Sequence, residues 1–337
     1  MLHPDASPDA SPVSAPEAYR PHAPWAGAHW QTIRNMITGV KTRLDNWPGE
    51  RLFFETNDGT GDRLTAMLHH PDLTRPGPLV IMIHGLTGCE DSSYQRRMAK
   101  DLLLAGYSVL RLNLRGAGPG RPHARNHYHS GKTEDLRAVL NGLPQGLDKQ
   151  GLACVGVSLG GNLLLKYMGE EGSTARFACA ISISAPIDLM LTAKRFLAFG
   201  NKPYHRYLIT RMKAEALAAP GLSKTDELTI KSIRNTFEFD DRLTGPLNGW
   251  SSATEYYQVN QAVGWLPGIG KPTLMIHALD DPWIPGHVYQ RLDWSGMPML
   301  TPHLTAKGGH VGFHTTDDGP PWHDRQTLSF LKHHLPV

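Results

Sequence analysis

Five short, strongly apolar runs recur along the chain, and helix-like segments lie between several of them. The runs are PLVIMIH (78–84), YSVLRLN (107–113), LACVGV (152–157), CAISIS (179–184) and PTLMIHA (272–278). Continuous apolar runs of this length are typical of strands buried on both faces of a sheet. Their alternation with helices predicts a mostly parallel central sheet flanked by helices, an α/β architecture.

The spacing of these runs also predicts how the chain is divided. The alternation breaks after Pro186, and about eighty residues rich in Arg, Lys and aromatic side chains precede the run at 272–278. We expect residues 187–265 to form a helical cap that is inserted into a core made of residues 26–186 and 266–337. Residues 1–25 are rich in Pro, Ala and Ser, which predicts a disordered tail.

Composition excludes several classes of partner. The chain has 337 residues and a formal net charge of only +3, with no dense run of Lys or Arg, so we expect no nucleic-acid partner. No apolar run approaches the roughly 18 residues of a membrane-spanning helix, so no integral membrane segment is expected. The sequence suggests no particular protein partner.

The compartment is predicted from the N-terminus and the cysteines. The N-terminus has neither a basic start nor an apolar core, so it does not resemble a secretory signal. Cys154 and Cys179 lie in apolar runs and, with Cys89, form no metal-binding spacing, which favours free thiols over a disulfide. A reducing cytoplasm fits these features.

One serine, Ser158, lies between an apolar run and a helix-like segment, GGNLLLKYMGEE (160–171). Gly156 and Gly160 flank it with the spacing G-x-S-x-G. A nucleophile elbow requires this strand–turn–helix order, because the sharp turn lifts the serine hydroxyl above the sheet. An ordinary glycine turn before a helix would give the same pattern, so other residues must decide.

An oxyanion site is predicted from the first apolar run. The run ends in His84-Gly85-Leu86, where a loop at the sheet edge would present the N–H of Leu86. Together with the N–H of Leu159, this group could bind an anionic oxygen. We expect His84 itself to hold the loop rather than to act as a base.

An acid and a base follow in the order that a serine triad of this kind requires. Asp280 and Asp281 end the last apolar run, and His310 lies behind two glycines in AKGGHVGF (306–313). The aspartates could instead cap a turn before Pro282, and His310 could be an ordinary loop histidine among 18. The ordered set at the ends of strands favours an esterase-type triad.

At this point the chain resembles the YheT-like family of α/β-hydrolases, which are related to ABHD-type esterases and lipases. The resemblance extends from about His29 to the C-terminus. It depends on HWQT (29–32), HGLTG (84–88), NLRGAG (113–118), YHSGKTEDL (128–136), GVSLGGN (156–162), SAPIDL (184–189), FDD (239–241), HALDDP (277–282) and GGHVGF (308–313). The resemblance implies the α/β-hydrolase fold and a triad of Ser158, one aspartate of the pair, and His310.

The resemblance also orders the two aspartates. Hydrolases of this fold often show G-x-x-D-P after the late strand, and placing Ala278 at that glycine makes Asp281 the acid. Asp280 would then brace the loop.

The cap contributes candidates for an acyl pocket, namely Leu189, Met190, Phe196, Leu197, Phe199, Tyr204 and Tyr207.

The function expected from these features is hydrolysis of carboxylic esters through an acyl-enzyme, on small-molecule esters of short to medium acyl chain. An acyltransferase with the same triad and a non-catalytic ligand-binding relative are the alternatives. No cofactor or metal is expected. The stretch GKT (131–133) lacks the first glycine of a phosphate loop, and RGAGPGRP (115–122) departs from a dinucleotide fingerprint at Arg121. The stretch HARNHYH (123–129) fits the family segment better than a metal site.

Overall fold

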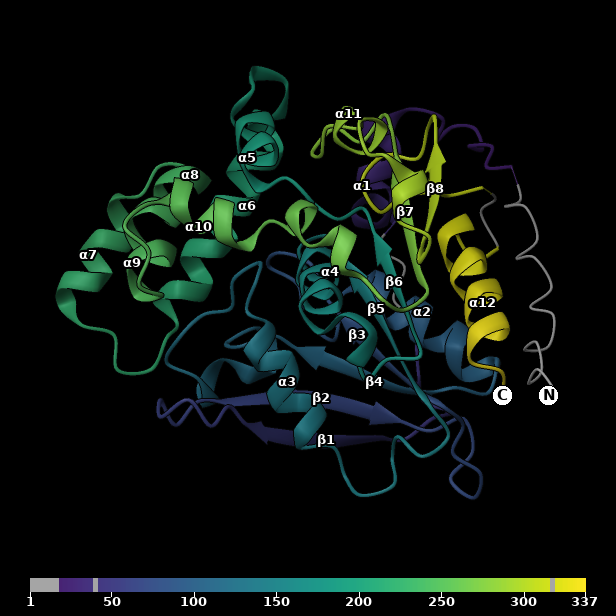
Figure 1. Cartoon of the computed structure of the whole chain (residues 1–337). Coiled ribbons are helices and arrows are strands. Elements are labelled where there is room, and N and C mark those ends of the chain that lie inside the picture. The colour runs from purple at the N-terminus through teal and green to yellow at the C-terminus, as the bar shows by residue number, and fades with distance from the viewer. Residues whose placement is uncertain (1–17, 39–41, 316–318) are drawn as a thin grey trace, which may run out of the picture.

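The computed structural model describes residues 18–38, 42–315 and 319–337 (Figure 1). Within these ranges the centre of the molecule is one sheet of eight strands with the order β1-β2-β4-β3-β5-β6-β7-β8. The strands are β1 (Gly49–Glu55), β2 (Arg63–His69), β3 (Leu79–Ile83), β4 (Ser108–Asn113), β5 (Leu152–Val157), β6 (Cys179–Ile183), β7 (Thr273–Ala278) and β8 (Leu300–Thr305). Strands β1 and β2 are antiparallel to their neighbours, and all other pairs are parallel.

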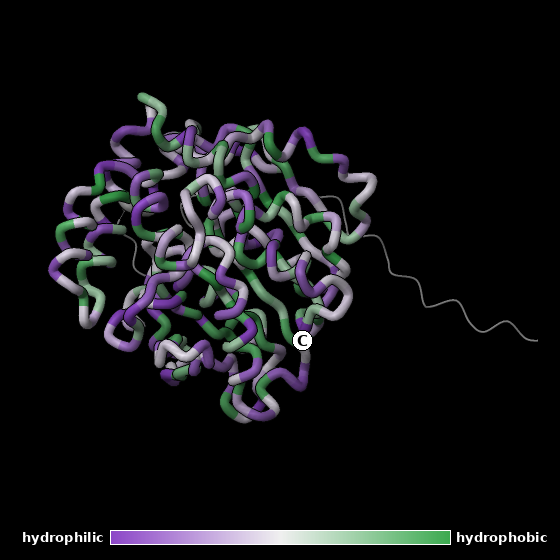
Figure 2. The backbone as a smooth tube through the Cα atoms, turned by 60° about the vertical axis from the view of Figure 1, so that its left-hand side comes forward, coloured by the Kyte–Doolittle hydropathy of each residue, from purple (hydrophilic) through white to green (hydrophobic). Residues whose placement is uncertain are grey.

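The five predicted strands are confirmed as β3 to β7. Each is buried along its whole length, because helices cover both faces of the sheet. Alternate residues enter different layers: Ile81 packs in one hydrophobic cluster, and Val80 and Met82 pack in the other. The central strands accordingly appear as hydrophobic stretches inside the molecule (Figure 2). The apolar runs therefore reflect two-sided burial.

Helices of the core are divided between these two layers. Helices α3 (Thr133–Asn141) and α4 (Leu159–Glu171) pack in the cluster that contains Ile81, and α2 (Ser93–Leu104) and α12 (Trp322–His334) pack in the other. Two further helices of the core are α1 (Ala28–Thr38) and the short α11 (His287–Gln290). In the part of the chain that the structure describes, no helix is both long and apolar enough to cross a membrane.

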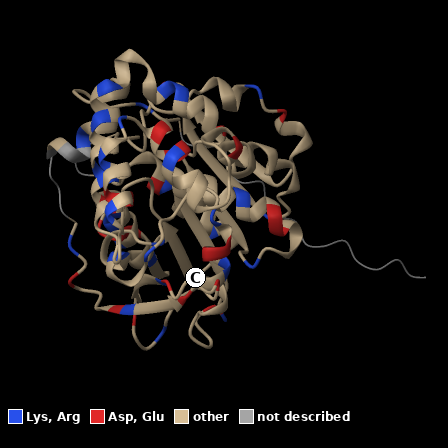
Figure 3. Ribbon diagram, turned by 90° about the vertical axis from the view of Figure 1, so that its left-hand side faces the viewer, with Lys and Arg blue, Asp and Glu red and all other residues tan. Residues whose placement is uncertain are grey.

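A helical insertion separates β6 from β7, as the prediction of a cap requires. It lies beyond the carboxyl ends of the parallel strands, and Lys and Arg are frequent on it where it faces the viewer in Figure 3. Its helices pack around small hydrophobic clusters of their own, such as Ile209, Met212 and Ile230. They are α5 (Leu189–Leu197), α6 (Lys202–Leu217), α7 (Lys224–Ser232), α8 (Thr236–Phe239), α9 (Gly245–Leu247) and α10 (Ala253–Asn260).

The predicted tail differs from the structure near its end. Residues 1–17 lie outside the described residues, so the prediction stays open there. Residue Tyr19, however, packs against Phe313 and Trp322, with ring centroids 5.7 and 5.8 Å apart, and its hydroxyl donates to the carbonyl of His314. The aromatic ring of Tyr19 packs here because α12 and the loop after β8 present an apolar face at this position. The boundary at residue 25 is therefore too late.

The cysteines are free thiols, and Cys154 and Cys179 are buried in the sheet as predicted. Burial raises the pKa of Cys179 to about 12. Both thiols are therefore protonated and act as small hydrophobic groups in the core.

Candidate active site

Ser158 occupies the sharp turn between β5 and α4. Its backbone has φ 53° and ψ −121°, a conformation that L-residues rarely adopt. The turn can close because Gly156 packs against the backbone of Gly160, and a Cβ on Gly160 would lie 2.5 Å from the carbonyl oxygen of His84. The two glycines of G-x-S-x-G are thus required by backbone contacts. The strained turn places the serine hydroxyl at the edge of the sheet.

The three residues predicted as a triad lie within hydrogen-bond distance of one another. His310 Nε2 is 3.0 Å from Ser158 Oγ, and His310 Nδ1 is 2.7 Å from Asp281 Oδ2. His310 and Asp281 are buried, whereas Ser158 is partly accessible. The Trp283 ring stacks on the imidazole, with centroids 4.3 Å apart. The imidazole is therefore held on one edge by a carboxylate and on one face by an indole.

The two neighbouring aspartates have different contacts. Asp281 Oδ1 accepts hydrogen bonds from the N–H groups of Trp283 and Ile284, which leaves Oδ2 for His310. Asp280 Oδ1 instead accepts from the N–H of Gly309, one residue before the histidine. Burial raises the pKa of Asp280. Burial also opposes ionisation of Asp281, but the interaction with His310 holds the pKa of Asp281 below its usual range.

The loop after β3 carries one of the two predicted oxyanion donors, the N–H of Leu86, toward Ser158, and the other belongs to Leu159 at the start of α4. Gly85 allows this approach, because a Cβ there would lie 3.0 Å from the Cβ of Ser158. Among the described residues, the backbone hydrogen bonds outside helices and strands assign no acceptor to the N–H of Leu86 or of Leu159. Leu86 and Leu159 line the same cavity as Ser158. Two donors beside a serine hydroxyl are the arrangement that an oxyanion requires.

His84 supports this loop. Its Nε2 accepts from the N–H of Leu114 at 3.1 Å, so Nδ1 carries the hydrogen and donates to the carbonyl of Gly85 at 2.8 Å. Burial lowers the pKa of His84 to about 4, so the ring is neutral near pH 7. Since both nitrogens are engaged, His84 holds the loop and has no free nitrogen for proton transfer.

Comparison with known proteins identifies the family of this chain. Residues 78–317 match the model of the alpha/beta hydrolase fold family. The YheT protein of Escherichia coli (strain K12) is 32% identical over 310 residues, which cover 90% of this chain and 89% of that protein. The chain belongs to the YheT-like α/β-hydrolases. Monoacylglycerol lipase of Saccharomyces cerevisiae (strain ATCC 204508 / S288c) is 30% identical over 266 residues. The aligned part covers 76% of this α/β-hydrolase and 59% of the lipase.

Solved structures show the same fold. A Pyrococcus furiosus esterase superposes on this α/β-hydrolase with a TM-score of 0.58, covering 86% of this chain and 92% of that one. The sequences are 18% identical, so the likeness concerns the fold alone. The expected family and architecture are confirmed by these findings and by the sheet order.

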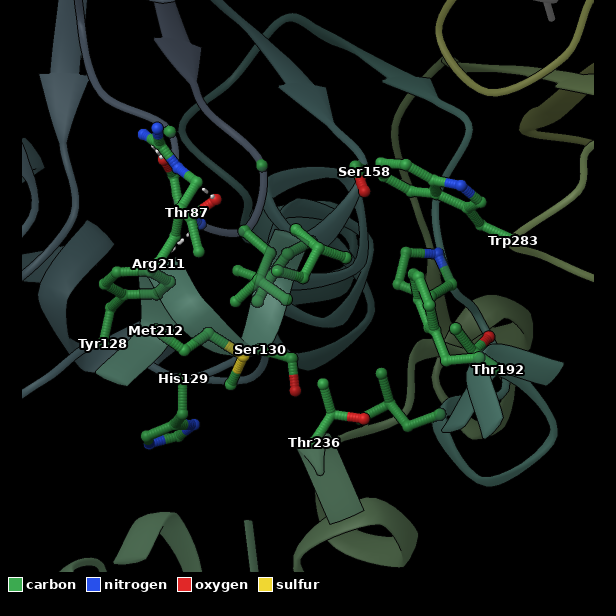
Figure 4. A pocket seen from close by; sticks show the side chains of 18 of the residues that line it. Thr87, Tyr128, His129, Ser130, Ser158, Thr192, Arg211, Met212, Thr236 and Trp283 are labelled. Carbon is green, nitrogen blue, oxygen red and sulfur yellow. Dashed lines mark hydrogen bonds between the residues drawn. The ribbon is translucent and has the colours of Figure 1, made fainter. Parts of the chain in front are cut away.

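A cavity of about 430 Å³ in this α/β-hydrolase joins Ser158 to the cap (Figure 4). Of the residues predicted to form an acyl pocket, Leu189, Phe196 and Tyr207 line it, and Leu208, Met212 and Phe239 add further apolar surface. Leu197 and Phe199 instead face solvent. The lining therefore combines Ser158 and His310 from the core with apolar side chains from the cap.

Sequence reasoning missed a link between the cap and the oxyanion loop. The N–H of Thr87 donates to the hydroxyl of Tyr128 at 2.7 Å, and that hydroxyl donates to Glu215 of α6 at 3.3 Å. Arg211, also on α6, donates to the hydroxyl and carbonyl oxygens of Thr87 at 3.2 and 3.0 Å (Figure 4). No local pattern could reveal this link, because 124 residues separate Thr87 from Arg211.

Trp283 was also missed, although a signal existed. It follows the Asp-Asp-Pro turn directly, so the acid of the triad already places it near the histidine. Metal ligands give no comparable signal: within the described ranges, no group of three or more His, Cys, Asp or Glu residues could hold a metal ion.

Proposed function

We propose that this α/β-hydrolase hydrolyses carboxylic esters through an acyl-enzyme formed on Ser158. The observation that carries the proposal is the continuous chain of hydrogen bonds from Ser158 through His310 to Asp281. Asp281 accepts the Nδ1 hydrogen of His310, so Nε2 is the nitrogen that can take the serine proton. The sequence relatives named as esterase and lipase support the same chemistry.

The reaction would proceed in two halves. Ser158 Oγ attacks the ester carbonyl while His310 Nε2 takes its proton, and His310 then gives that proton to the departing alcohol. In the second half His310 activates a water molecule, which attacks the acyl-enzyme and releases the acid and free serine. Asp281 remains ionised and stabilises the imidazolium in both halves.

The oxyanion of each tetrahedral intermediate would bind the N–H groups of Leu86 and Leu159. These donors belong to two different elements, the loop after β3 and the start of α4, and they converge because Gly85 lets the loop approach Ser158. Removing one oxyanion donor costs about 10²- to 10³-fold in kcat in enzymes of this type. Correct placement of the loop is therefore required for the full rate.

Neutral esters of short to medium acyl chain are the proposed substrates. Apolar residues of the cap line the cavity, and each buried methylene contributes about 0.8 kcal/mol. The charged lining does not favour an anionic substrate, since Arg211 is engaged with Thr87. Burial raises the pKa of Glu215 to about 7 and that of Asp240 to about 6, so burial disfavours the charged form of both carboxyl groups in the lining.

Substitution of the nucleophile tests the proposal. Ser158→Ala keeps the Cβ and the turn, so the protein should fold while kcat/KM for p-nitrophenyl esters falls by about 10³-fold or more. A fluorophosphonate should label the wild type at Ser158 and leave the variant unlabelled. Labelling of another residue, or full activity of the variant, would refute the proposal.

Product analysis, together with the labelling experiment, separates the two alternatives. An acyltransferase would transfer the acyl group to an added alcohol faster than to water, which product analysis measures. A ligand-binding relative without activity would show neither hydrolysis nor labelling while remaining folded.

We further propose a cytoplasmic location, consistent with three free cysteines.

A further inference from the structure

Positive charge is concentrated on one segment of the cap. Helices α5 and α6 with the turn between them, residues 189–217, contain six Lys and Arg residues and one carboxylate. Their net charge is +5, whereas the whole chain has +3, so the remainder carries −2. The near-neutral total therefore conceals a strongly basic region, which is visible on the cap in Figure 3.

The turn between α5 and α6 also exposes apolar side chains. Phe199 is 82% exposed and Leu197 is 46% exposed. The turn projects from the top of the molecule in Figure 1, where Figure 2 shows hydrophobic colour. Lys202 lies over the Phe199 ring, 4.3 Å from its centroid. We define the basic apolar edge as Lys194, Leu197, Phe199, Lys202 and Arg206, all of which are exposed.

The edge lies beside the mouth of the cavity. Phe196, which lies within this segment, and Tyr207, which follows it, both line the cavity, and Tyr207 is 41% exposed. The side chain of Tyr207 therefore reaches from the lining to solvent. The first residues of α1 lie against the same helix, since His29 stacks on Tyr204 of α6 with ring planes 8° apart. Whatever binds the edge is brought next to the entrance.

We propose that the basic apolar edge docks on an anionic phospholipid bilayer. Exposed large apolar residues with cationic neighbours are the features of a segment that enters the lipid headgroup region. Each cationic side chain near an anionic bilayer increases partitioning by about fivefold. The charge of the segment selects a negatively charged surface, and Phe199 and Leu197 select one that accepts apolar groups.

Docking would have a consequence for substrate choice that rests on the proposed ester hydrolysis. Esters dissolved in the bilayer would reach the cavity past Tyr207 without crossing bulk water. The docking itself is independent of the triad, so vesicle binding and ester hydrolysis can succeed or fail separately.

Cosedimentation of the full chain with vesicles tests the proposal. The wild type should bind vesicles of mixed phosphatidylcholine and phosphatidylglycerol more tightly than pure phosphatidylcholine, and added salt should weaken the binding. Two double variants, Leu197→Ser with Phe199→Ser and Lys194→Glu with Lys202→Glu, should each reduce binding by about tenfold or more. Their activity on a dissolved p-nitrophenyl ester should match that of the wild type.

The control is Leu73→Ser, which removes an apolar side chain that is 73% exposed in the loop between β2 and β3. This variant should bind vesicles like the wild type. Equal binding of all variants, or absence of wild-type binding to the anionic vesicles, would overturn the proposal. A concentration-dependent dimer that Phe199→Ser abolishes, without vesicle binding, would assign the edge to a second copy of the chain instead.

Discussion

At the scale of single residues, adjacent aspartates have separate tasks because consecutive side chains leave the backbone in different directions. Asp281 turns toward His310 and is fully buried in a set of three hydrogen bonds, whereas Asp280 accepts from the backbone of the histidine loop. One carboxylate therefore faces the imidazole, and the other positions the segment that carries it.

The two aspartates should respond differently to the same substitution. Asp281→Asn removes the carboxylate that stabilises the imidazolium, so kcat should fall by about 10³- to 10⁴-fold with little change in KM. Asp280→Asn keeps an oxygen that can accept from Gly309, so its loss of kcat should be smaller. Steady-state kinetics of both variants on one ester measures the difference. A larger loss of kcat for Asp280→Asn would show that Asp280, and not Asp281, is the acid that orients His310.

Glu215 should make stability depend on pH. Burial raises its pKa from 4.5 to about 7, against the opposing effects of Arg211 and Tyr128. The folded state therefore binds the proton more tightly than the unfolded state. This contribution to stability is fully present below pH 4.5 and is lost as the pH rises through about 7.

Glu215→Gln cannot titrate, so it isolates this effect. Relative to the wild type, its free energy of unfolding should increase by about 1–3 kcal/mol between pH 5 and pH 8. Urea unfolding at several pH values measures the difference. Parallel pH profiles of the two proteins would contradict the prediction.

Among the elements, the cap both covers Ser158 and is connected through α6 to the loop that carries the predicted oxyanion donor Leu86. Arg211 and Glu215 lie one turn apart on α6, and both reach Thr87, directly or through Tyr128. Thr87 has a positive φ of 56° and follows the predicted oxyanion donor Leu86. The position of α6 therefore influences the geometry of the loop.

Arg211→Met should lower kcat by about tenfold and change KM much less, because an oxyanion donor acts in the transition state. Lys213→Met is the matched control. Lys213 lies on the same helix but donates to the carbonyls of Lys231 and Ile233 within the cap. If both variants lose kcat equally, the effect comes from the cap as a whole and not from the contact with Thr87.

In the whole molecule, the N-terminal end of the described chain and the C-terminal helix α12 lie on the same layer. Tyr19 lies against Trp322 at the start of α12, and Tyr107 donates to the carbonyl of Leu335 near the C-terminus. These contacts close the layer that α2 and α12 form on the sheet. The segment before α1 thus contributes to the core rather than only leading into it.

Truncation should expose this contribution. Removal of residues 1–25 should lower the melting temperature by a few degrees more than removal of residues 1–17, since it deletes the Tyr19 side chain. Tyr19→Ala in the full chain should reproduce most of that difference. Calorimetry of the three proteins is the measurement, and identical melting temperatures would show that Tyr19 adds no stability.

Features that depend on neighbouring residues could be predicted from the amino-acid sequence. Two-sided burial requires continuous apolar runs, so strands β3 to β7 could be predicted from their own residues. The turn at Ser158 requires glycines two positions away, so it too was visible locally. The order of Ser158, Asp281 and His310 along the chain, each at the end of a strand, was enough to predict that they meet.

Tertiary structure decided what depends on distant contacts. Three features could not be predicted from the residues adjacent in the sequence. They are the contact of Arg211 with Thr87, the packing of Tyr19 on Trp322 and the exposure of Phe199. Phe199 was predicted to line the cavity because it is aromatic and lies in the cap. It faces solvent because α5 ends at Leu197 and α6 begins at Lys202, which leaves the connecting turn outside both packed faces. Composition cannot specify which side of a helix or turn is covered, since only the partners that pack against it determine that.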